Sequence, residues 1–175
     1  MRNISILSGE FKGRKLKTLN SGRIRPTSSR VRKSIFDMLM DMDSKRVLDL
    51  FAGSGSLGFE ALSLGAQSVT FVDNDNRSLS LLHRNKEKFH TDRIAIFKSD
   101  GYQYLEKVKG QFDVIFIDPP YRNPDPNRLK ENAMNRLTSG GVLIIETSKR
   151  LGWRDKEAKI KEYGDTQISI FWREH

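Results

Sequence analysis

The chain has 175 residues, enough for one domain with a substantial core and too few for two enzyme domains joined by a linker. Charged residues make up 30% of the sequence and hydrophobic residues 37%, a balance that argues against disorder as the main state. Lysine and arginine outnumber aspartate and glutamate by 31 to 22, and the net charge of +9 favours a polyanionic partner, either nucleic acid or an anionic membrane.

Cysteine is absent, which excludes a disulfide framework, a thiolate zinc site and a cysteine nucleophile. No apolar window approaches the roughly 20 residues of a membrane span. The first ten positions carry charges where a signal peptide has an apolar stretch. The three histidines are too scattered to indicate a metal site. We therefore expect a cytoplasmic monomer with no metal and no membrane association.

The first 25 residues read as a basic arm. The alternating segments Ile4–Leu7 and Lys15–Leu19 are separated by glycines, which predicts a strand, a turn and a second strand. We expect residues 1–25 to form an N-terminal β arm and residues 26–175 to form a single globular domain.

A helix of about four turns is predicted after the arm. Thr27 and Ser28 are candidates for its N-cap. The apolar residues that follow at helical spacing are Val31, Ile35, Leu39 and Met42.

Cationic side chains gather in the arm and around the start of this helix. Those that we expect to contact the phosphates of a nucleic acid are Arg14, Arg23, Arg25, Arg30, Arg32 and Lys33. A run of charge is often only a solvated face, and from charge alone the two interpretations are equally supported.

Short apolar runs then alternate with helical patterns. The predicted strands are 47–51, 69–72, 94–97, 112–117 and 142–145. The predicted helices are 57–64, 79–89, 102–108 and 129–137. Strand and helix alternation of this kind predicts a mostly parallel sheet with helices on both faces. Near the end of the chain, 159–163 and 167–172 flank Gly164 and Asp165, which predicts a C-terminal antiparallel hairpin.

The first of these strands leads into a glycine turn, whose residues spell G-x-G-x-x-G at Gly53, Gly55 and Gly58. Such glycines let the backbone come close to a nucleotide at the carboxyl end of a strand. The predicted cofactor-binding residues of the turn are Phe51, Ala52, Gly53, Ser54, Gly55 and Gly58.

Acidic residues at two strand ends narrow the choice of cofactor. Asp73 follows Gly53 by 20 residues, the position where a carboxylate binds both ribose hydroxyls, and Asn74 is next to it. A nicotinamide dinucleotide shares this fingerprint but needs room for a substrate domain that the chain lacks. Asp49 favours S-adenosylmethionine, because a carboxylate suits the ammonium group of that cofactor and repels a pyrophosphate.

Asp100 and Gly101 follow the third strand, and the same topology places them beside the adenine ring of the cofactor. An acidic N-cap without a ligand is the alternative for Asp73 or Asp100 taken alone. Their occurrence at consecutive strand ends favours the cofactor.

The sharpest signal is an apolar strand followed by Asp118, Pro119, Pro120 and Tyr121. Two successive prolines end the strand and hold a rigid loop. An exocyclic base amine is a poor nucleophile because its lone pair is delocalised into the ring. Hydrogen bonds from the amine to the Asp118 carboxylate and the Pro119 carbonyl would localise that lone pair, while Tyr121 stacks on the base. Methyl transfer then depends on alignment and charge placement.

Three stretches carry a resemblance to a known family. Residues 25–36 read R-P-T-x-x-R-V-R-x-x-I-F, residues 48–61 read L-D-x-F-A-G-S-G-x-x-G-x-E-A, and residues 118–121 read D-P-P-Y. Over nearly its whole length the chain resembles the RsmD family, the 16S ribosomal RNA guanine-N2 methyltransferases. The resemblance implies a Rossmann-like class I methyltransferase fold with a seven-stranded sheet. It also implies S-adenosylmethionine as cofactor and methylation of guanine 966 in an assembled or assembling 30S small subunit.

Two features differ from the family pattern. Asp73 stands where the family usually has glutamate, and the segment between Tyr121 and Gly140 is shorter than usual. Methylation of adenine N6 or cytosine N4 stays open, because D-P-P-Y serves those amines as well. A non-catalytic RNA-binding assembly factor is the alternative of another class, although the retained acidic residues argue against it.

Overall fold

The structure is a computed structural model that describes residues 2–18, 27–39, 41–120 and 124–174. The strands of its main sheet are β3 (Arg46–Leu50), β4 (Ser68–Asp73), β5 (Ile94–Lys98), β6 (Phe112–Ile117), β7 (Leu137–Ser148), β8 (Lys159–Tyr163) and β9 (Thr166–Trp172). The helices are α1 (Ser29–Leu39), α2 (Ser56–Ser63), α3 (Asn76–Lys86), α4 (Gly101–Lys107), α5 (Pro126–Met134) and the 3-10 turn η1 (Lys149–Leu151). None of these helices is long and apolar enough to cross a membrane.

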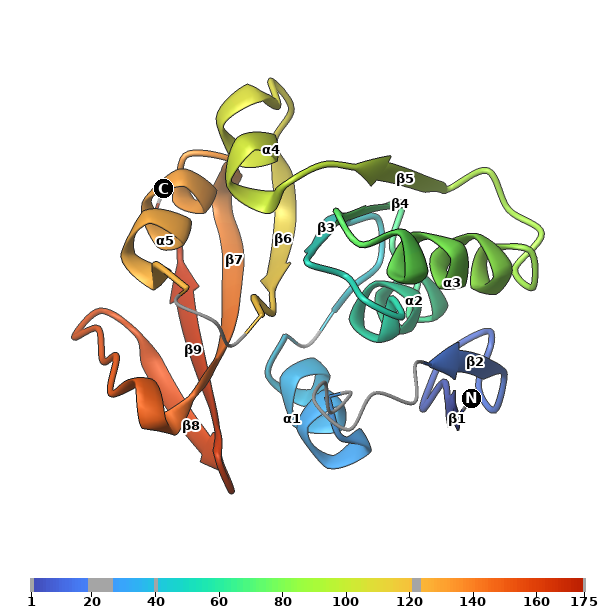
Figure 1. The fold of residues 1–175 in the computed structure, drawn as a ribbon, viewed down its shortest axis with the longest axis horizontal. Helices are drawn as coiled ribbons and strands as arrows, with labels where there is room; N and C mark the ends of the chain where they lie inside the picture. The colour runs from blue at the N-terminus through green and yellow to red at the C-terminus, as the bar shows by residue number, and fades with distance from the viewer. Residues whose placement is uncertain (1, 19–26, 40, 121–123, 175) are drawn as a thin grey trace.

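The strands of the main sheet lie in the order β5-β4-β3-β6-β7-β9-β8 (Figure 1). The first five of these are parallel to one another, whereas β9 is antiparallel to both β7 and β8. The predicted mostly parallel sheet and its C-terminal antiparallel hairpin are therefore confirmed.

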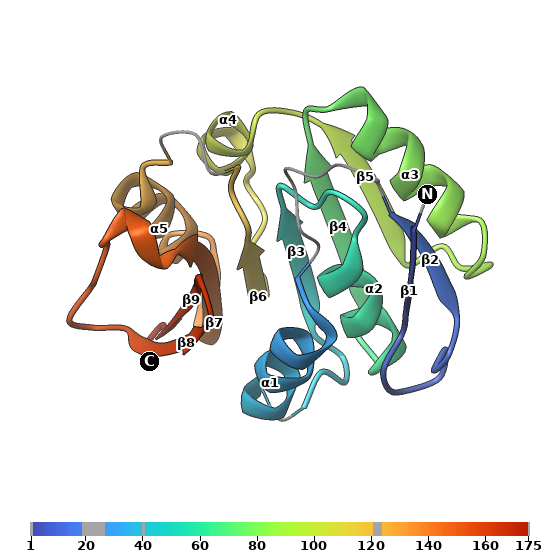
Figure 2. The same cartoon turned by 60° about the horizontal axis from the view of Figure 1, so that its bottom comes forward.

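Helices cover both faces of the sheet (Figure 2). On the face of α1, α2 and α3, the core includes Phe59, Phe71 and Phe116. On the face of α4 and α5, it includes Ile115 and Leu129. Adjacent residues of β6 enter opposite cores because side chains alternate along a strand. Both faces are therefore buried, as the apolar runs predict.

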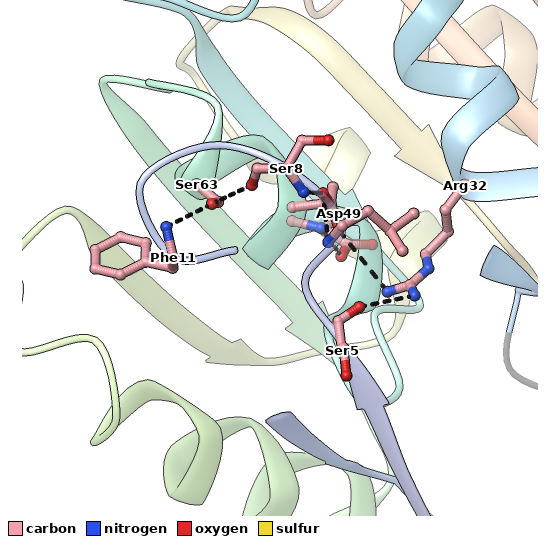
Figure 3. A network of polar contacts seen from close by, with 9 residues as sticks. Ser5, Ser8, Phe11, Arg32, Asp49 and Ser63 are labelled. Atoms are coloured by element: carbon pink, nitrogen blue, oxygen red, sulfur yellow. Dashed lines mark hydrogen bonds and ion pairs between the residues drawn. The ribbon is translucent and has the colours of Figure 1, made fainter. Parts of the chain in front are cut away.

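The N-terminal strands β1 (Arg2–Ser5) and β2 (Lys15–Thr18) form an antiparallel hairpin, as predicted. The hairpin packs on α2, and Ile6 and Leu16 are buried in the core beneath it. Polar contacts fasten it further (Figure 3): the Phe11 N–H donates to Ser63 Oγ at 2.9 Å, and Ser63 Oγ donates to the Ser8 carbonyl at 2.6 Å. The arm is thus an integral layer of the fold.

Several predicted boundaries are wrong, and two helix ends show the reason. The first helix is 11 residues long and ends at Leu39, and Met42 is buried beyond it. The helix predicted to end at Leu137 ends at Met134, and Leu137 instead opens β7 opposite Phe112. Leu137 has helical spacing from Leu129 and is fully buried, but its burial comes from the sheet.

Candidate active site

The carboxyl ends of the parallel strands meet at one edge of the sheet. Strand β3 lies between β4 and β6 and is parallel to both. The register pairs Leu50 with Ile117, so the glycine turn (residues 51–55) lies beside the Asp118 corner (residues 118–120). The Asp118 N–H donates to the Leu50 carbonyl at 3.4 Å. The predicted cofactor turn and the predicted catalytic corner therefore occupy neighbouring strand ends on the same edge.

The glycine turn has the backbone that close approach of a ligand requires. Gly53 has a φ of 56°, and a Cβ added there would meet nothing within 4 Å, so the turn faces open space. The Gly55 N–H donates to the Ala52 carbonyl at 2.7 Å. Gly58 has a different role, because an added Cβ would lie 2.3 Å from the Phe71 ring. The last glycine of the motif thus lets α2 pack closely on β4.

Two buried carboxylates hold this turn. Asp73 accepts hydrogen bonds from the Gly53 N–H at 2.8 Å and the Asp75 N–H at 2.9 Å, and Asp49 accepts one from the Gly58 N–H at 2.9 Å. Burial raises the pKa of Asp49 to about 8, opposed by the Gly58 N–H and reinforced by the charge of Asp73. Asp73 thus holds the turn at Gly53, whereas Asp49 holds the first turn of α2 at Gly58.

An aromatic pair borders the turn on the α4 side. A Cβ added to Gly101 would lie 2.4 Å from the Phe51 ring, so only glycine lets this ring pack there. The Tyr102 ring contacts Phe51 edge-on at a centroid distance of 6.1 Å. Tyr102 was missed in the sequence, although it follows the predicted Gly101 directly. Both rings pack against the core on the face of α4 and α5, next to the turn.

The remaining predicted cofactor residues differ in their surroundings. Asp100 caps α4 by accepting the Gln103 N–H at 3.1 Å, so the N-cap role is present whatever else it binds. Ser54 is half-buried, and its carbonyl accepts from Asn85 Nδ2 at 3.1 Å. Asn74 is exposed at the end of β4. The cofactor roles of these residues stay predictions.

The Asp118 corner places a carboxylate at the edge of the sheet. Asp118 is half-buried, Pro119 is buried and Pro120 is exposed, whereas Tyr121 lies outside the described residues. No side chain or backbone N–H within the described ranges donates to the Asp118 carboxylate. Burial, the charge of Glu146 and the charge of Asp49 together raise the pKa of Asp118 well above its usual range.

Glu146 is the acidic residue that the sequence analysis missed. It lies on β7, is only 5% exposed and accepts a hydrogen bond from Thr27 Oγ1 at 3.0 Å. Burial raises the pKa of Glu146, and the Thr27 hydroxyl opposes that rise. A signal was present, since Glu146 directly follows the apolar run 142–145 as Asp118 follows β6.

A large cavity opens beside this corner. Its volume is about 1230 Å³, and Pro119, Glu146, Arg30, Arg150 and Tyr163 are among the residues that line it. Within the described part of the chain, no group of three or more histidine, aspartate or glutamate side chains is placed to hold a metal ion. The cavity thus joins the catalytic corner to exposed cationic side chains.

The predicted RNA contacts have different outcomes. Arg30 is exposed on α1 and lines the cavity. Lys33 is exposed and forms an ion pair with Asp37 at 2.8 Å. Arg23 and Arg25 lie outside the described residues, so their roles stay predictions.

The prediction that Arg32 contacts RNA is wrong, because this side chain is 2% exposed. Its guanidinium donates to the Ser5 carbonyl at 3.1 Å and lies 4.0 Å from the Glu60 carboxylate (Figure 3). Burial lowers the pKa of Arg32, and Glu60 opposes that change. Arg32 lies one turn from the buried Ile35, on the side of α1 that faces the hairpin, and it joins these two parts of the fold.

Arg14 is half-buried and is also engaged within the protein. It donates a hydrogen bond to the Lys88 carbonyl. Its guanidinium lies 4.6 Å from the centroid of the Phe11 ring and 5.3 Å from that of Phe89. Arg14 therefore fastens the hairpin to the end of α3, and an RNA contact by this residue stays a prediction.

Comparison with known proteins identifies relatives of this chain. The family described as "Conserved hypothetical protein 95" matches residues 4–172. The chain is 39% identical over 183 residues to "Putative rRNA methyltransferase YlbH" of Bacillus subtilis (strain 168), a match that covers 95% of this chain and 97% of that protein. It is 36% identical over 157 residues to "Ribosomal RNA small subunit methyltransferase D" of Haemophilus influenzae, covering 83% of this chain and 79% of that protein.

A solved structure, "Putative methyltransferase yhhF from Escherichia coli", matches with a TM-score of 0.86 at 27% identity. The match covers 99% of each chain. The predicted α/β fold of the class I methyltransferase type is therefore confirmed.

Proposed function

The chain belongs to the methyltransferase family described as "Conserved hypothetical protein 95", and from this premise we propose that it methylates the exocyclic N2 of a guanine in 16S ribosomal RNA. The methyl donor is S-adenosylmethionine. The observation that carries the proposal is the meeting of the glycine turn and the Asp118 corner at adjacent strand ends. That placement supports the proposal, because a methyl donor held at the turn and an amine held at the corner would then lie at the same edge of the sheet.

The residues around the turn fit this cofactor. The backbone at Gly53 faces open space, so a ligand can approach it closely. In this proposal Asp73 would bind the ribose hydroxyls and Asp49 would face the ammonium group. Phe51 and Gly101 would border the adenine ring, and Asp100 would bind at its edge. When bound, the cofactor supplies an electrophilic methyl group.

The chain itself supplies alignment at the corner. The Asp118 carboxylate and the Pro119 carbonyl accept hydrogen bonds from the guanine amine and turn its lone pair toward the methyl group. The amine becomes more acidic as the new bond forms, and Asp118 Oδ is placed to receive its proton. Tyr121 and the rigid Pro120 would confine the base after it has left its helix.

The substrate assignment is supported by charge and by relatives. Two relatives carry names that specify rRNA, and one of these specifies the small subunit. The net charge of +9 suits a polyanion. Arg30 and Arg150 line the cavity and would supply cations for phosphates. In this proposal the protein acts on the small subunit or its assembly intermediate, in the cytoplasm.

The test is to incubate the protein with labelled S-adenosylmethionine and small subunits that lack the modification, and then to map the labelled nucleotide. We expect a single N2-methylguanine in 16S rRNA. A label on adenine N6 or cytosine N4 would contradict the base assignment. If calorimetric titration detected no binding of S-adenosylmethionine, a non-catalytic assembly factor would become the better explanation.

A further inference from the structure

Glu146 and Asp118 project from neighbouring strands onto the same face of the sheet. The register pairs Phe116 with Ile144, and both side chains belong to the core beneath α1. Glu146 lies two residues further along β7, and Asp118 directly follows the end of β6, so continued alternation places both on that same face. Thr27, just before α1, donates its hydroxyl to Glu146 at 3.0 Å and confirms this placement.

The Glu146 carboxylate is enclosed and keeps unused acceptor capacity. Its residue is 5% exposed, and only Oε2 accepts a hydrogen bond from the described residues, the one from Thr27. An ionised carboxylate offers about four acceptor positions and no donor. Glu146 lines the same cavity as Pro119 of the Asp118 corner. The register of β6 and β7 places Asp118 beside Glu146, so a base bound at Glu146 would also lie near the Asp118 carboxylate.

The charges around the cavity suit a nucleotide. Arg30 and Arg150 are exposed and line its solvent side together with Asp165, whose carboxylate lies 3.7 Å from the Arg150 guanidinium. The buried wall carries Glu146. A nucleotide places phosphates outside and base N–H groups inside, which matches this polarity.

The group beside the reactive amine differs among the bases. In guanine the ring nitrogen N1 next to the C2 amine carries a hydrogen. In adenine the N1 next to the C6 amine is a lone pair, and so is the cytosine N3 next to the C4 amine. A carboxylate at this position accepts the N1–H of guanine and repels the lone pairs of adenine N1 and cytosine N3.

We infer that Glu146 is a specificity-determining residue, which accepts the N1–H of guanine while the Asp118 corner holds the amine. This inference rests on the proposed function and names the group that enforces its choice of base. Thr27 acts as a positioning residue, because its hydroxyl holds Glu146 Oε2 and leaves Oε1 for the base.

The experiment uses small subunits assembled in vitro with the mapped target left as guanine or replaced by 2-aminopurine. The analogue keeps the C2 amine but presents a lone pair at N1. We expect the wild type to favour guanine by about 100-fold or more in kcat/KM. Glu146→Gln should narrow this preference by about 10-fold or more, because a Gln amide can donate to the N1 of 2-aminopurine. 2-Aminopurine also lacks the O6 of guanine. The effect of this loss on kcat/KM cancels when wild type and Glu146→Gln are compared, unless it involves Glu146.

The control is Glu87→Gln, the same change on an exposed residue just beyond α3, at the opposite edge of the sheet. It should keep the wild-type preference. Calorimetric titration with S-adenosylmethionine and thermal unfolding show whether Glu146→Gln is folded. If it is not, Thr27→Val provides the second test and should narrow the preference by about 2- to 5-fold, the loss of one hydrogen bond.

The possible failures are distinct. A wild type that methylates guanine, combined with a preference unchanged in both Glu146→Gln and Thr27→Val, would overturn the role of Glu146 and leave the proposed function standing. A wild type that methylates adenine or cytosine, or no base at all, would overturn both. A preference narrowed to the same extent in Glu87→Gln would also overturn the inference, because it would place the effect outside the cavity.

Discussion

The two halves of the candidate site use their carboxylates differently. In the cofactor half, Asp49 and Asp73 accept hydrogen bonds from backbone N–H groups of Gly58, Gly53 and Asp75. In the substrate half, Glu146 receives one hydroxyl and the Asp118 carboxylate receives no donor from the described residues. The chain itself supplies the donors to Asp49 and Asp73, whereas the donors to the Asp118 carboxylate would come from the substrate in the proposed mechanism.

This difference has an energetic side. Asp118 lies close enough to Glu146 and Asp49 for both charges to raise its pKa. Like charges in a partly buried site destabilise the free protein, a common property of sites that bind a complementary ligand. Donors from a base amine would relieve this repulsion. Variants of the two halves should therefore affect different measurements.

The largest effect is expected at the substrate half. Asp118→Asn keeps the shape of the side chain but removes its charge, and we expect methyl transfer to fall by about 100- to 1000-fold. Affinity for S-adenosylmethionine should change by no more than about twofold, because Asp118 acts on the amine. Labelled methyl transfer and calorimetric titration measure the two quantities. Asp92→Asn, on an exposed residue just before β5, is the control, and equal activity in both variants would remove Asp118 from the mechanism.

The next effect concerns Asp49 and the dependence of stability on pH. Its pKa of about 8 in the folded protein means that the folded state binds a proton that the unfolded chain has already released above about pH 4. The contribution of Asp49 to stability therefore declines as the pH rises from about 4 through 8. The free energy of unfolding of Asp49→Asn, taken relative to that of the wild type, should therefore increase by about 2–4 kcal/mol as the pH rises from 5 to 8.

Urea unfolding of the cofactor-free proteins at both pH values measures this change in relative stability. A difference between variant and wild type that stayed constant with pH would show that the folded Asp49 titrates in its ordinary range. The sign is opposite to that of an ion-paired carboxylate, whose stabilising effect is present at high pH and lost as the pH falls.

Two glycines separate packing from ligand approach within the cofactor half. Gly58→Ala forces a Cβ against the Phe71 ring, and we expect a loss of about 1–3 kcal/mol in the free energy of unfolding. Gly53→Ala meets no neighbour and should lose only about 1–2 kcal/mol through its positive φ, yet it should weaken cofactor binding more strongly than it affects stability. Thermal unfolding and calorimetric titration compare the variants. Equal effects on both measurements at Gly53 would argue against a ligand at the turn.

The smallest effect is expected at the rim of the cavity. Arg30→Ala should weaken RNA binding by about 10-fold or less and reduce the salt slope of log K by about 0.7–0.9, the loss of one phosphate contact. Stability should be unchanged because the side chain is exposed. Arg84→Ala, on the exposed side of α3, is the control, and binding measured over a series of salt concentrations distinguishes the two. Identical slopes would place the RNA elsewhere.

Local patterns predicted most of the fold. The alternation of apolar runs and helical spacing is enough to predict a parallel sheet, because each strand must be covered on both faces. The end of α5 could not be predicted in this way. Leu137 has the same spacing from Leu129 that a helix would give it, and only its pairing with Phe112 shows that it belongs to a strand.

The prediction of the site was limited for a similar reason, because the burial of a charged side chain depends on tertiary packing. Asp49, Asp73 and Asp118 were found because strand-end position and motif agree. Arg32 shares a basic stretch with Arg30, and charge alone does not reveal that only one of them points outward. Their different surroundings arise from the packing of α1 on the N-terminal hairpin.

The contact between the N-terminal hairpin and α2 has a consequence for truncation of the protein. The Leu7 and Ser8 N–H groups donate to Glu60 at 3.0 and 2.8 Å, and Glu60 is 1% exposed on α2, two residues after Gly58. Deleting the hairpin would remove these backbone donors from the buried Glu60 carboxylate on α2, the helix that follows the glycine turn. The N-terminal hairpin therefore stabilises the helix on which the cofactor half is built.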